Sequence, residues 1–238
     1  MKIIKPAIIL VRPQLPENIG LIARAMQNFD LNELILVSPR EKWPNKKSLQ
    51  ASKHASSIIK KTKVYQSLDL AVSKFHYIIA TTNRKRFLEK KNIISFNILN
   101  KYINTNQKLA ILFGPENSGL SNEDLRLADC LFTIKTSKKN TSLNLSHAVS
   151  IISYKINEFI TNKKKYLNKE DLLINKSSKK ELINFMNYLI LQLDKENFFY
   201  PLSKKQSMID NIYAIFLKAS LSKKEVNTLW GMLKKLIK

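Results

Sequence analysis

The chain has 238 residues, with 41 lysines and arginines against 18 aspartates and glutamates, so its formal net charge is +23. A hydrophobic fraction of 44% is a normal supply for a globular core, which excludes a disordered tail and a small disulfide-stapled scaffold. No apolar run approaches the roughly 20 residues of a membrane span. The single cysteine, Cys130, excludes an internal disulfide and a cysteine-rich zinc cluster. We therefore expect a soluble cytoplasmic protein with no metal and no membrane partner.

The charge alone is a weak indication of a nucleic acid partner. Only six of the 41 basic residues are arginine, and heavy use of lysine, asparagine and isoleucine is also what codon drift in an A+T-rich genome produces. The same bias makes glycine rare. We therefore expect the remaining glycines to mark places where a Cβ atom cannot be accommodated: Gly20, Gly114, Gly119 and Gly231.

Short apolar runs alternate with helical patterns along the first two thirds of the chain. The runs are typical of strands buried on both faces of a parallel sheet and cover residues 7–12, 34–37, 77–81, 109–113 and 130–134. Helical spacing of apolar residues predicts helices over 16–29, 48–60, 67–74 and 143–160, and residues 121–124 have the pattern of a capping box. The alternation predicts an α/β fold with a mostly parallel sheet and helices on both faces.

The composition changes after residue 160. Residues 161–180 are rich in lysine and polar side chains without a sustained period, which favours a solvated linker. Three helical patterns follow, over 181–195, 204–219 and 222–237. We therefore divide the chain into an α/β domain (1–160), a linker (161–180) and a small all-helical C-terminal extension (181–238).

The first of three segments with functional potential comes directly after the first predicted strand. Asn18 and Gly20 are expected at a strand-to-helix turn, where backbone N–H groups and the helix dipole favour an anion. Arg24, one turn further on, would project toward the same anion. The alternative is an ordinary helix with a surface arginine.

The second and third segments lie at 113–120 and 141–148. The second, FGPENSGL, is a sharp loop at the carboxyl end of a buried strand, where α/β sheets place their ligands, and it holds Gly114 and the carboxylate of Glu116. A plain tight turn is the alternative. The third, TSLNLSHA, enters the long helix, so Ser142 and Asn144 either cap that helix or hold a ligand.

In this order, the three segments resemble the motifs of the SpoU/TrmH branch of the SPOUT RNA methyltransferases: N-x-G-x-x-x-R, F-G-x-E-x-x-G-L and S-L-N. The first strand, the LNELILVSP segment that follows the first helix, and the helical tail are most similar to the TrmJ type, whose members methylate tRNA. The resemblance covers residues 5–160 by motif and 180–238 more weakly. It implies a trefoil-knotted SPOUT domain, one of the exceptions to the rule against threaded loops, S-adenosylmethionine bound in the knot, and a homodimer formed through the knot region.

The resemblance also implies which residues carry the function. The cofactor would be held mostly by backbone groups of eight residues: Thr81, Thr82, Asn83, Gly114, Ile134, Ser142, Leu143 and Asn144. The reaction would be methyl transfer to a ribose 2′-hydroxyl of tRNA, at nucleotide 32 of the anticodon loop. Another tRNA or rRNA site, or a non-catalytic RNA-binding assembly factor, remain the alternatives.

Arg24 is the residue to which the resemblance assigns deprotonation of the 2′-hydroxyl. A guanidinium stays protonated in essentially all proteins. The second interpretation is therefore that Arg24 clamps the neighbouring phosphate or stabilises developing alkoxide charge. Glu116 would orient Arg24 or hold the second-motif loop, and Asn18 would fix the RNA backbone.

Overall fold

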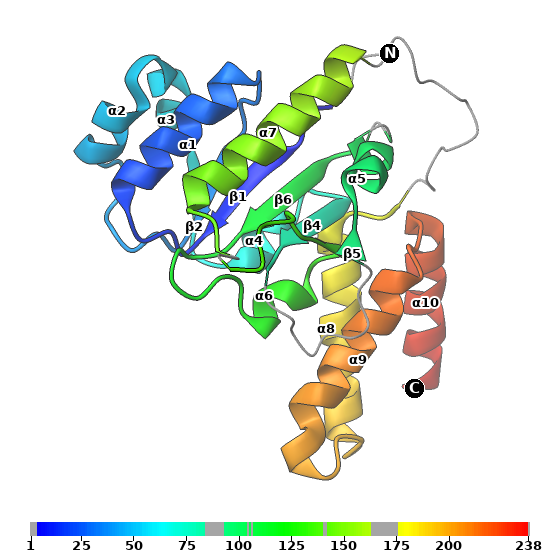
Figure 1. The fold of residues 1–238 in the computed structure, drawn as a ribbon. Helices are drawn as coiled ribbons and strands as arrows, with labels where there is room; N and C mark the ends of the chain where they lie inside the picture. The colour runs from blue at the N-terminus through cyan, green and yellow to red at the C-terminus, as the bar shows by residue number, and fades with distance from the viewer. Residues whose placement is uncertain are drawn as a thin grey trace.

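A parallel seven-stranded sheet forms the centre of the computed structural model (Figure 1), with the strand order β3-β2-β1-β6-β4-β7-β5. The structure describes residues 4–83, 93–103, 105, 107–139, 142–162 and 176–237, so Thr141 of the third segment and most of the predicted linker lie outside the described residues. All strand pairs in the described part are parallel. The strands are β1 (Ala7–Val11), β2 (Leu34–Val37), β3 (Lys63–Tyr65), β4 (Tyr77–Thr81), β5 (Ile93–Ile94), β6 (Leu109–Phe113) and β7 (Cys130–Phe132).

The helices connect the strands and then continue beyond the sheet. Those of the first part are α1 (Pro16–Asn28), α2 (Lys46–Ser52), the short 3₁₀ turn η1 (Lys53–Ala55), α3 (Ser56–Lys61), α4 (Leu68–Val72), α5 (Phe96–Ile103), α6 (Asn122–Arg126) and α7 (Leu145–Asn162). Those of the C-terminal part are α8 (Lys179–Lys195), the 3₁₀ turn η3 (Leu202–Lys204), α9 (Lys205–Lys218) and α10 (Lys223–Leu236).

The apolar runs predict the central strands well. The predictions for β2, β4 and β6 are confirmed to the residue, because each is a continuous apolar run buried on both sheet faces. The last predicted strand is too long: β7 ends at Phe132, so Ile134 lies two residues beyond it. Sequence analysis missed β3 and β5 because one is short and partly exposed and the other has only two residues.

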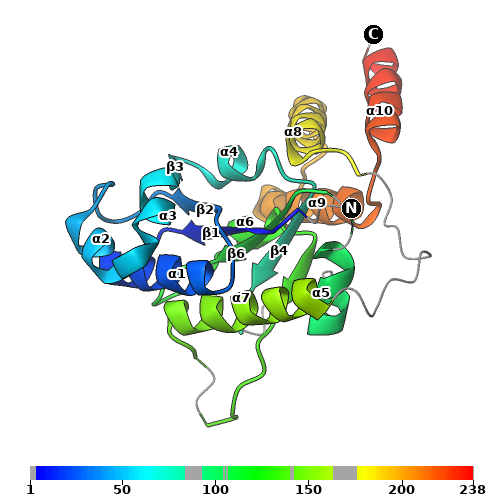
Figure 2. The same cartoon turned by 90° about the horizontal axis from the view of Figure 1, so that it is seen from above.

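Helices cover both faces of the sheet, as predicted, and each face has its own hydrophobic core. Figure 2 shows α1, α5 and α7 on one side of the sheet and α4, α8 and α9 on the other. Ile8 and Leu10 of β1 point into the first core, with Met26 of α1 and Ile152 of α7. Ile9 of β1 points into the second core. The period of two along β1 therefore divides the apolar run between two helical layers.

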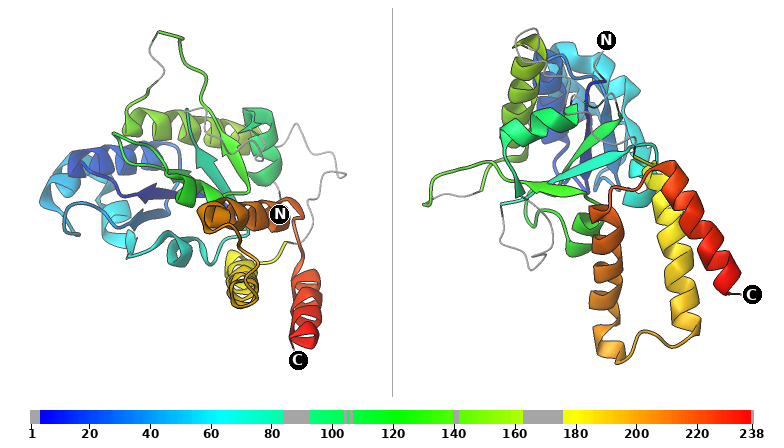
Figure 3. Two further views of the ribbon diagram at one scale, coloured as in Figure 1. Left: turned by 90° about the horizontal axis from the view of Figure 1, so that it is seen from below. Right: turned by 90° about the vertical axis from the view of Figure 1, so that its right-hand side faces the viewer.

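The C-terminal helices share the second core with the sheet. Leu182 and Phe185 of α8, Tyr213 of α9 and Val226 of α10 belong to the same buried cluster as Ile9, and the three helices extend away from the sheet in Figure 3. The expectation that 161–180 is solvated throughout is wrong at Lys176 and Lys179, which are only 3% and 1% exposed. Among the described residues, no helix is long and apolar enough to cross a membrane.

Candidate active site

A pocket of about 380 Å³ opens at the carboxyl ends of β4, β6 and β7, beside the start of α7. This is the edge at which parallel α/β sheets place their ligands. Its walls come from segments far apart in sequence. They are Thr81–Asn83, Phe113–Asn117, Gly119, Leu120, Phe132, Ile134, Thr136, Ser142, Leu143, Leu145 and Ala148.

Eight of the eleven residues singled out from the sequence line this pocket: Thr81, Thr82, Asn83, Gly114, Glu116, Ile134, Ser142 and Leu143. The other three, Asn18, Arg24 and Asn144, do not line it. Sequence analysis missed several of the apolar walls, including Phe132 and Ala148. These residues look like ordinary core positions in a strand or helix pattern, so no sequence signal separates them from the core.

Glu116 joins the second-motif loop to the start of α1. Its carboxylate accepts hydrogen bonds from the backbone N–H groups of Gln14 (2.9 Å) and Leu15 (3.3 Å) and from Nδ2 of Asn18 (2.9 Å). Of the two roles considered for Glu116, the structure therefore shows the one that holds the loop. No contact of Glu116 with Arg24 is present among the described residues.

Asn18 lies in the first turn of α1, at the strand-to-helix junction that the sequence predicts. It is only 6% exposed, with its side chain already bonded to Glu116. Its Oδ1 atom also faces Nδ2 of Asn144 at 3.5 Å. Asn18 thus donates to Glu116 and accepts from Asn144, which makes it the link between the second and third segments.

Asn144 caps α7, which was the simpler of the two sequence interpretations for that residue. Its Oδ1 atom accepts from the backbone N–H of Ser146 at 2.8 Å and from the Ser146 hydroxyl at 2.7 Å. With its contact to Asn18, this cap ties the start of α7 to α1. Glu116, Asn18, Asn144 and Ser146 thus form one polar chain, the motif network, which joins all three segments.

Close backbone approaches explain two of the motif glycines. A Cβ atom on Gly114 would lie 2.2 Å from the backbone nitrogen of Leu120, where the second-motif loop folds back on itself. A Cβ atom on Gly20 would lie 2.4 Å from the carbonyl oxygen of Ser48. The expectation that Gly20 lies at the strand-to-helix turn is therefore wrong. Gly20 lies in the second turn of α1, where α2 packs against it. Gly119 has a φ of +64°, which an L side chain rarely adopts. The expectation fails at Gly231 in α10, where a Cβ atom would meet no described atom within 4 Å.

A second connection holds the same loop, and sequence analysis missed it. The Arg12 guanidinium pairs with both carboxylate oxygens of Asp124, with Nη1 donating to Oδ1 at 3.2 Å. Asp124 also accepts from the backbone N–H of Ser121 at 2.7 Å, which completes the predicted capping box of α6. The loop between β6 and α6 is thus tied to the β1–α1 segment at both ends. The capping box is visible in the sequence, but its arginine partner is 112 residues away.

Arg24 lies on the exposed side of α1, outside the pocket. Within the described part of the chain, its guanidinium has no hydrogen bond or ion pair. It lies six residues after Asn18, which is about 9 Å along a helix. Arg24 is therefore an exposed cation, further along α1 than Asn18, that no described residue engages.

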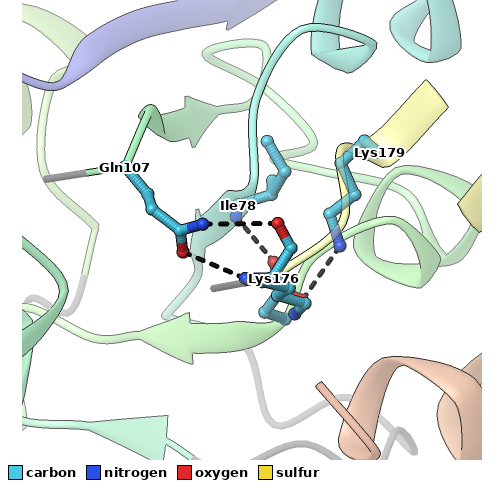
Figure 4. A network of polar contacts seen from close by, with 5 residues as sticks. Ile78, Gln107, Lys176 and Lys179 are labelled. Carbon is cyan, nitrogen blue, oxygen red and sulfur yellow. Dashed lines mark hydrogen bonds and ion pairs between the residues drawn. The ribbon is translucent and has the colours of Figure 1, made fainter. Parts of the chain in front are cut away.

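A buried group of charges, which we call the tail anchor, lies away from the pocket and attaches the C-terminal part to the sheet (Figure 4). The carboxylate of Asp129 accepts from Nζ of Lys176 and from Nζ of Lys179 (2.9 Å) through Oδ1, and from the backbone N–H of Ile78 (2.7 Å) through Oδ2. The Gln107 side chain bonds to the backbone of Lys176. The anchor therefore joins the first residues of the tail to β4 and the turn before β7.

Burial and charge act in opposite directions on the tail anchor. Burial alone raises the pKa of Asp129, but the neighbouring ammonium groups of Lys179 and Lys176 outweigh it and lower that pKa to about 2. Burial lowers the pKa of Lys179 to about 8, despite the attraction of Asp129. Both carboxylate oxygens of Asp129 are used and its side chain is 6% exposed, so this cluster is built for attachment.

No group of three or more histidine, cysteine, aspartate or glutamate side chains in the described part of the chain is placed to hold a metal ion. Cys130 is buried in the core, as its position in a strand pattern indicates.

The fold and the pocket define an α/β protein with a small-molecule site at the carboxyl edge of its parallel sheet, and comparison with known families gives its class. The model of the SpoU rRNA Methylase family matches residues 5–154, so the chain belongs to that family. The resemblance seen in the three motifs is thereby confirmed.

Among relatives, the chain is similar to proteins of the TrmJ type. The tRNA (cytidine-2′-O-)-methyltransferase TrmJ of Methanocaldococcus jannaschii is 35% identical over 185 residues, which is 73% of this chain and 80% of that protein. The tRNA (cytidine/uridine/adenosine-2′-O-)-methyltransferase TrmJ of Pseudomonas aeruginosa is 26% identical over 95% of this chain and 91% of its own length. The crystal structure of TrmJ from Z. mobilis ZM4 superposes with a TM-score of 0.89 at 34% identity, covering 99% of this chain and all of that one.

Proposed function

We propose that the protein transfers a methyl group from S-adenosylmethionine to a ribose 2′-hydroxyl of tRNA. The observation that carries the proposal is the pocket at the carboxyl edge of the sheet, where the second and third motif segments form the walls and the motif network ties them to α1. The printed activities of the TrmJ relatives support the choice of tRNA and of the 2′-hydroxyl.

The pocket residues fit the methyl donor. Its volume of about 380 Å³ is within the range of about 300–1,000 Å³ typical of small-molecule sites. The close approach of the Leu120 backbone to Gly114 leaves no room for a side chain there and keeps main-chain groups at the wall. Thr81, Thr82, Asn83, Gly114, Ile134, Ser142 and Leu143 would hold the cofactor, which supplies a methyl group on a positively charged sulfur.

Arg24 acts on the RNA side of the reaction in this proposal. The acceptor is an alcohol that must lose its proton as the carbon–oxygen bond forms. A guanidinium that is charged and exposed stabilises a nearby phosphate or the developing oxyanion, and the proton leaves to the phosphate or to water. Arg24 is exposed and has no protein partner in the described chain, so its guanidinium is accessible to RNA.

The motif network positions these parts. Glu116 and Asn144 hold the second-motif loop and the start of α7 at fixed places relative to α1, the helix that carries Arg24. Holding donor and acceptor sites in register is worth a large part of a transfer rate. Asn18 is a positioning residue in this proposal, and its contact to the RNA backbone stays a prediction.

Three finer properties implied by the family resemblance belong to the same proposal. They are the trefoil knot around the pocket, a homodimer through this region, and action in the cytoplasm on nucleotide 32 of the anticodon loop. Exposed apolar side chains on the α1 and α7 side of the sheet support the homodimer, namely Leu15, Leu21 and Tyr154, which are 51%, 43% and 46% exposed. Sedimentation of the purified protein tests the dimer.

The test of the function is methyl transfer from radiolabelled S-adenosylmethionine to unmodified tRNA transcripts, followed by mapping of 2′-O-methyl positions. We expect incorporation into tRNA at nucleotide 32. Incorporation at another position, or into rRNA fragments alone, would correct the target. Tight RNA binding without incorporation would contradict the enzyme assignment and favour an assembly factor.

A further inference from the structure

Thr133 lies between two residues that line the pocket but does not line the pocket itself. Phe132 and Ile134 are both walls of the pocket, and Thr133 directly follows the last residue of β7. Because side chains alternate along an extended chain, the Thr133 side chain points away from the space that its two neighbours enclose. A half-buried hydroxyl in such a place is expected to bond to the protein rather than to a ligand.

The Thr133 hydroxyl donates a hydrogen bond to the backbone carbonyl oxygen of Thr82 at 2.8 Å. Thr82 is itself a wall of the pocket and comes directly after β4. Its backbone N–H donates to the carbonyl oxygen of Phe132 at 3.0 Å. Both backbone polar groups of Thr82 are therefore bonded to the chain at the end of β7, one through the backbone and the other through the Thr133 side chain.

This hydroxyl takes the place of the next rung in the ladder between β4 and β7. The two strands are parallel, with Thr81 opposite Phe132. In a parallel ladder, the bond from Thr82 to Phe132 would be followed by a bond from the backbone N–H of Ile134 to the Thr82 carbonyl. The carbonyl accepts from Thr133 instead, and β7 ends at Phe132. The strands can thus separate at the pocket without leaving this carbonyl unpaired.

A second threonine hydroxyl crosses the neighbouring pair of strands at the same edge. Thr81, the last residue of β4, donates from Oγ1 to the carbonyl oxygen of Leu112 on β6 at 2.8 Å. The strands β6, β4 and β7 are adjacent in the sheet, and all three end at the pocket. Side-chain hydroxyls therefore join the ends of all three strands. Thr81 also lines the pocket, whereas Thr133 acts from behind its wall.

We propose that Thr133 is a positioning residue for the methyl donor, which sets the separation of Thr82 and Ile134 in the wall of the cofactor pocket. It acts through the Thr82 carbonyl and does not touch the donor. Without the hydroxyl, the Ile134 N–H is the donor that the ladder offers to this carbonyl, and the ladder extends by one rung into the pocket. The identity of the ligand as S-adenosylmethionine rests on the proposed function.

The test is Thr133→Val, which removes the hydroxyl and keeps the branched shape of the side chain. Calorimetric titration should show binding of S-adenosylmethionine about 3- to 10-fold weaker than in wild type, the change expected from one hydrogen bond. Thr133→Ser keeps the hydroxyl and should bind as wild type does. Thr62→Val is the matched control, because Thr62 donates to the Ile58 carbonyl at 2.8 Å, is also half-buried and lies outside the pocket. It should leave the affinity unchanged.

Two readouts separate positioning from a general loss of stability. In transfer assays, the KM for S-adenosylmethionine should rise in Thr133→Val while the KM for tRNA stays unchanged, because Arg24 lies on α1, outside the pocket. Amide hydrogen exchange of the ligand-free protein, followed by NMR, should be slower at Ile134 in Thr133→Val than in wild type, because that N–H enters the ladder. Thr62→Val should leave the exchange at Ile134 unchanged.

The inference is overturned if Thr133→Val binds S-adenosylmethionine as tightly as wild type, if Thr133→Ser binds as weakly as Thr133→Val, or if Thr62→Val shares the loss. Unchanged exchange at Ile134 in ligand-free Thr133→Val would also overturn it. If wild type binds no S-adenosylmethionine, the proposed function fails, and the exchange at Ile134 still decides whether Thr133 sets this wall.

Discussion

The motif network and the tail anchor both join distant parts of the chain, but they do so with different chemistry. In the network, one carboxylate, Glu116, receives neutral backbone and amide donors beside an open pocket. In the anchor, one carboxylate, Asp129, receives two lysines that are almost fully buried. The neutral donors around Glu116 hold the second-motif loop and leave the pocket open to solvent. The buried opposite charges around Asp129 attach the C-terminal part to the sheet, and loss of any one of them is costly.

The two regions therefore respond differently to the loss of their carboxylate. Removing Asp129 leaves two buried ammonium groups without a counter-charge, which is far more costly than removing an exposed pair. Removing Glu116 leaves neutral donors near a pocket that water reaches. Loss of Asp129 therefore acts on stability alone, whereas loss of Glu116 costs less stability and also loosens the loop beside the pocket.

The largest effect is expected from Asp129→Asn. We expect the free energy of unfolding to fall by about 3–5 kcal/mol, because the charges of Lys176 and Lys179 remain buried and unpaired. Urea titration followed by circular dichroism measures it. Asp194→Asn is the matched control, since its partner Lys205 and its own side chain are partly exposed, and it should cost less than about 1 kcal/mol. Equal losses in the two variants would contradict the anchor.

Next is Arg24→Ala, which should reduce methyl transfer by about 100- to 1,000-fold, the usual loss when one charge-stabilising donor is removed. Because Arg24 is exposed and outside the pocket, the affinity for S-adenosylmethionine and the unfolding free energy should not change. Single-turnover kinetics measure the methyl-transfer step, and calorimetric titration measures the affinity for the cofactor. Wild-type transfer by this variant would exclude Arg24 from the reaction.

A smaller effect is expected from Glu116→Ala. Loss of three accepted hydrogen bonds should lower the unfolding free energy by about 1–3 kcal/mol. It should also loosen the second-motif loop and weaken cofactor binding, which calorimetry measures. Glu123→Ala, in the first turn of α6 and not part of the network, is the control. Unchanged cofactor affinity in Glu116→Ala would show that the loop does not depend on the network.

The smallest effect is the acid dependence of the anchor. The pKa of Asp129 is about 2 in the folded protein, below its ordinary value of 3.8. The unfolded chain therefore takes up this proton first, so the contribution of Asp129 is complete above about pH 4–5 and falls as the pH drops toward 2. Urea titrations between pH 5 and pH 3 should show a steeper loss of stability in wild type than in Asp129→Asn. Parallel losses would contradict the lowered pKa.

The sequence predicts the pocket edge much better than the tail anchor. The central strands are continuous apolar runs, and the carboxyl edge of a parallel sheet is a general ligand site, so the pattern of residues places Gly114 there. Ser142 is assigned to the same site by the family resemblance. The anchor depends on Asp129 meeting Lys176 and Lys179 across 47 and 50 residues. In a chain rich in lysine, nothing local distinguishes two buried lysines from solvated ones.

Within the site, the sequence predicts contacts between neighbouring residues, but it does not predict which side of a helix packs against another element. The capping box at Ser121 and Asp124 is confirmed because both partners lie within one helical turn. The expected place of Gly20 at the strand-to-helix turn is wrong, because Gly20 lies in the second turn of α1 and packs against α2, whereas Asn18 lies in the first turn. Which face of α1 is buried depends on α2, and that tertiary contact is not encoded in the motif itself.

The most direct test of the central claim is calorimetric titration of S-adenosylmethionine into wild type, Ala148→Phe and His147→Phe. Ala148 lines the pocket, whereas His147 is its exposed neighbour on α7. The account predicts binding to wild type and to His147→Phe, and at least about tenfold weaker binding to Ala148→Phe, because the larger ring occupies the pocket. Equal affinity in all three proteins would show that the methyl donor does not bind at this edge of the sheet.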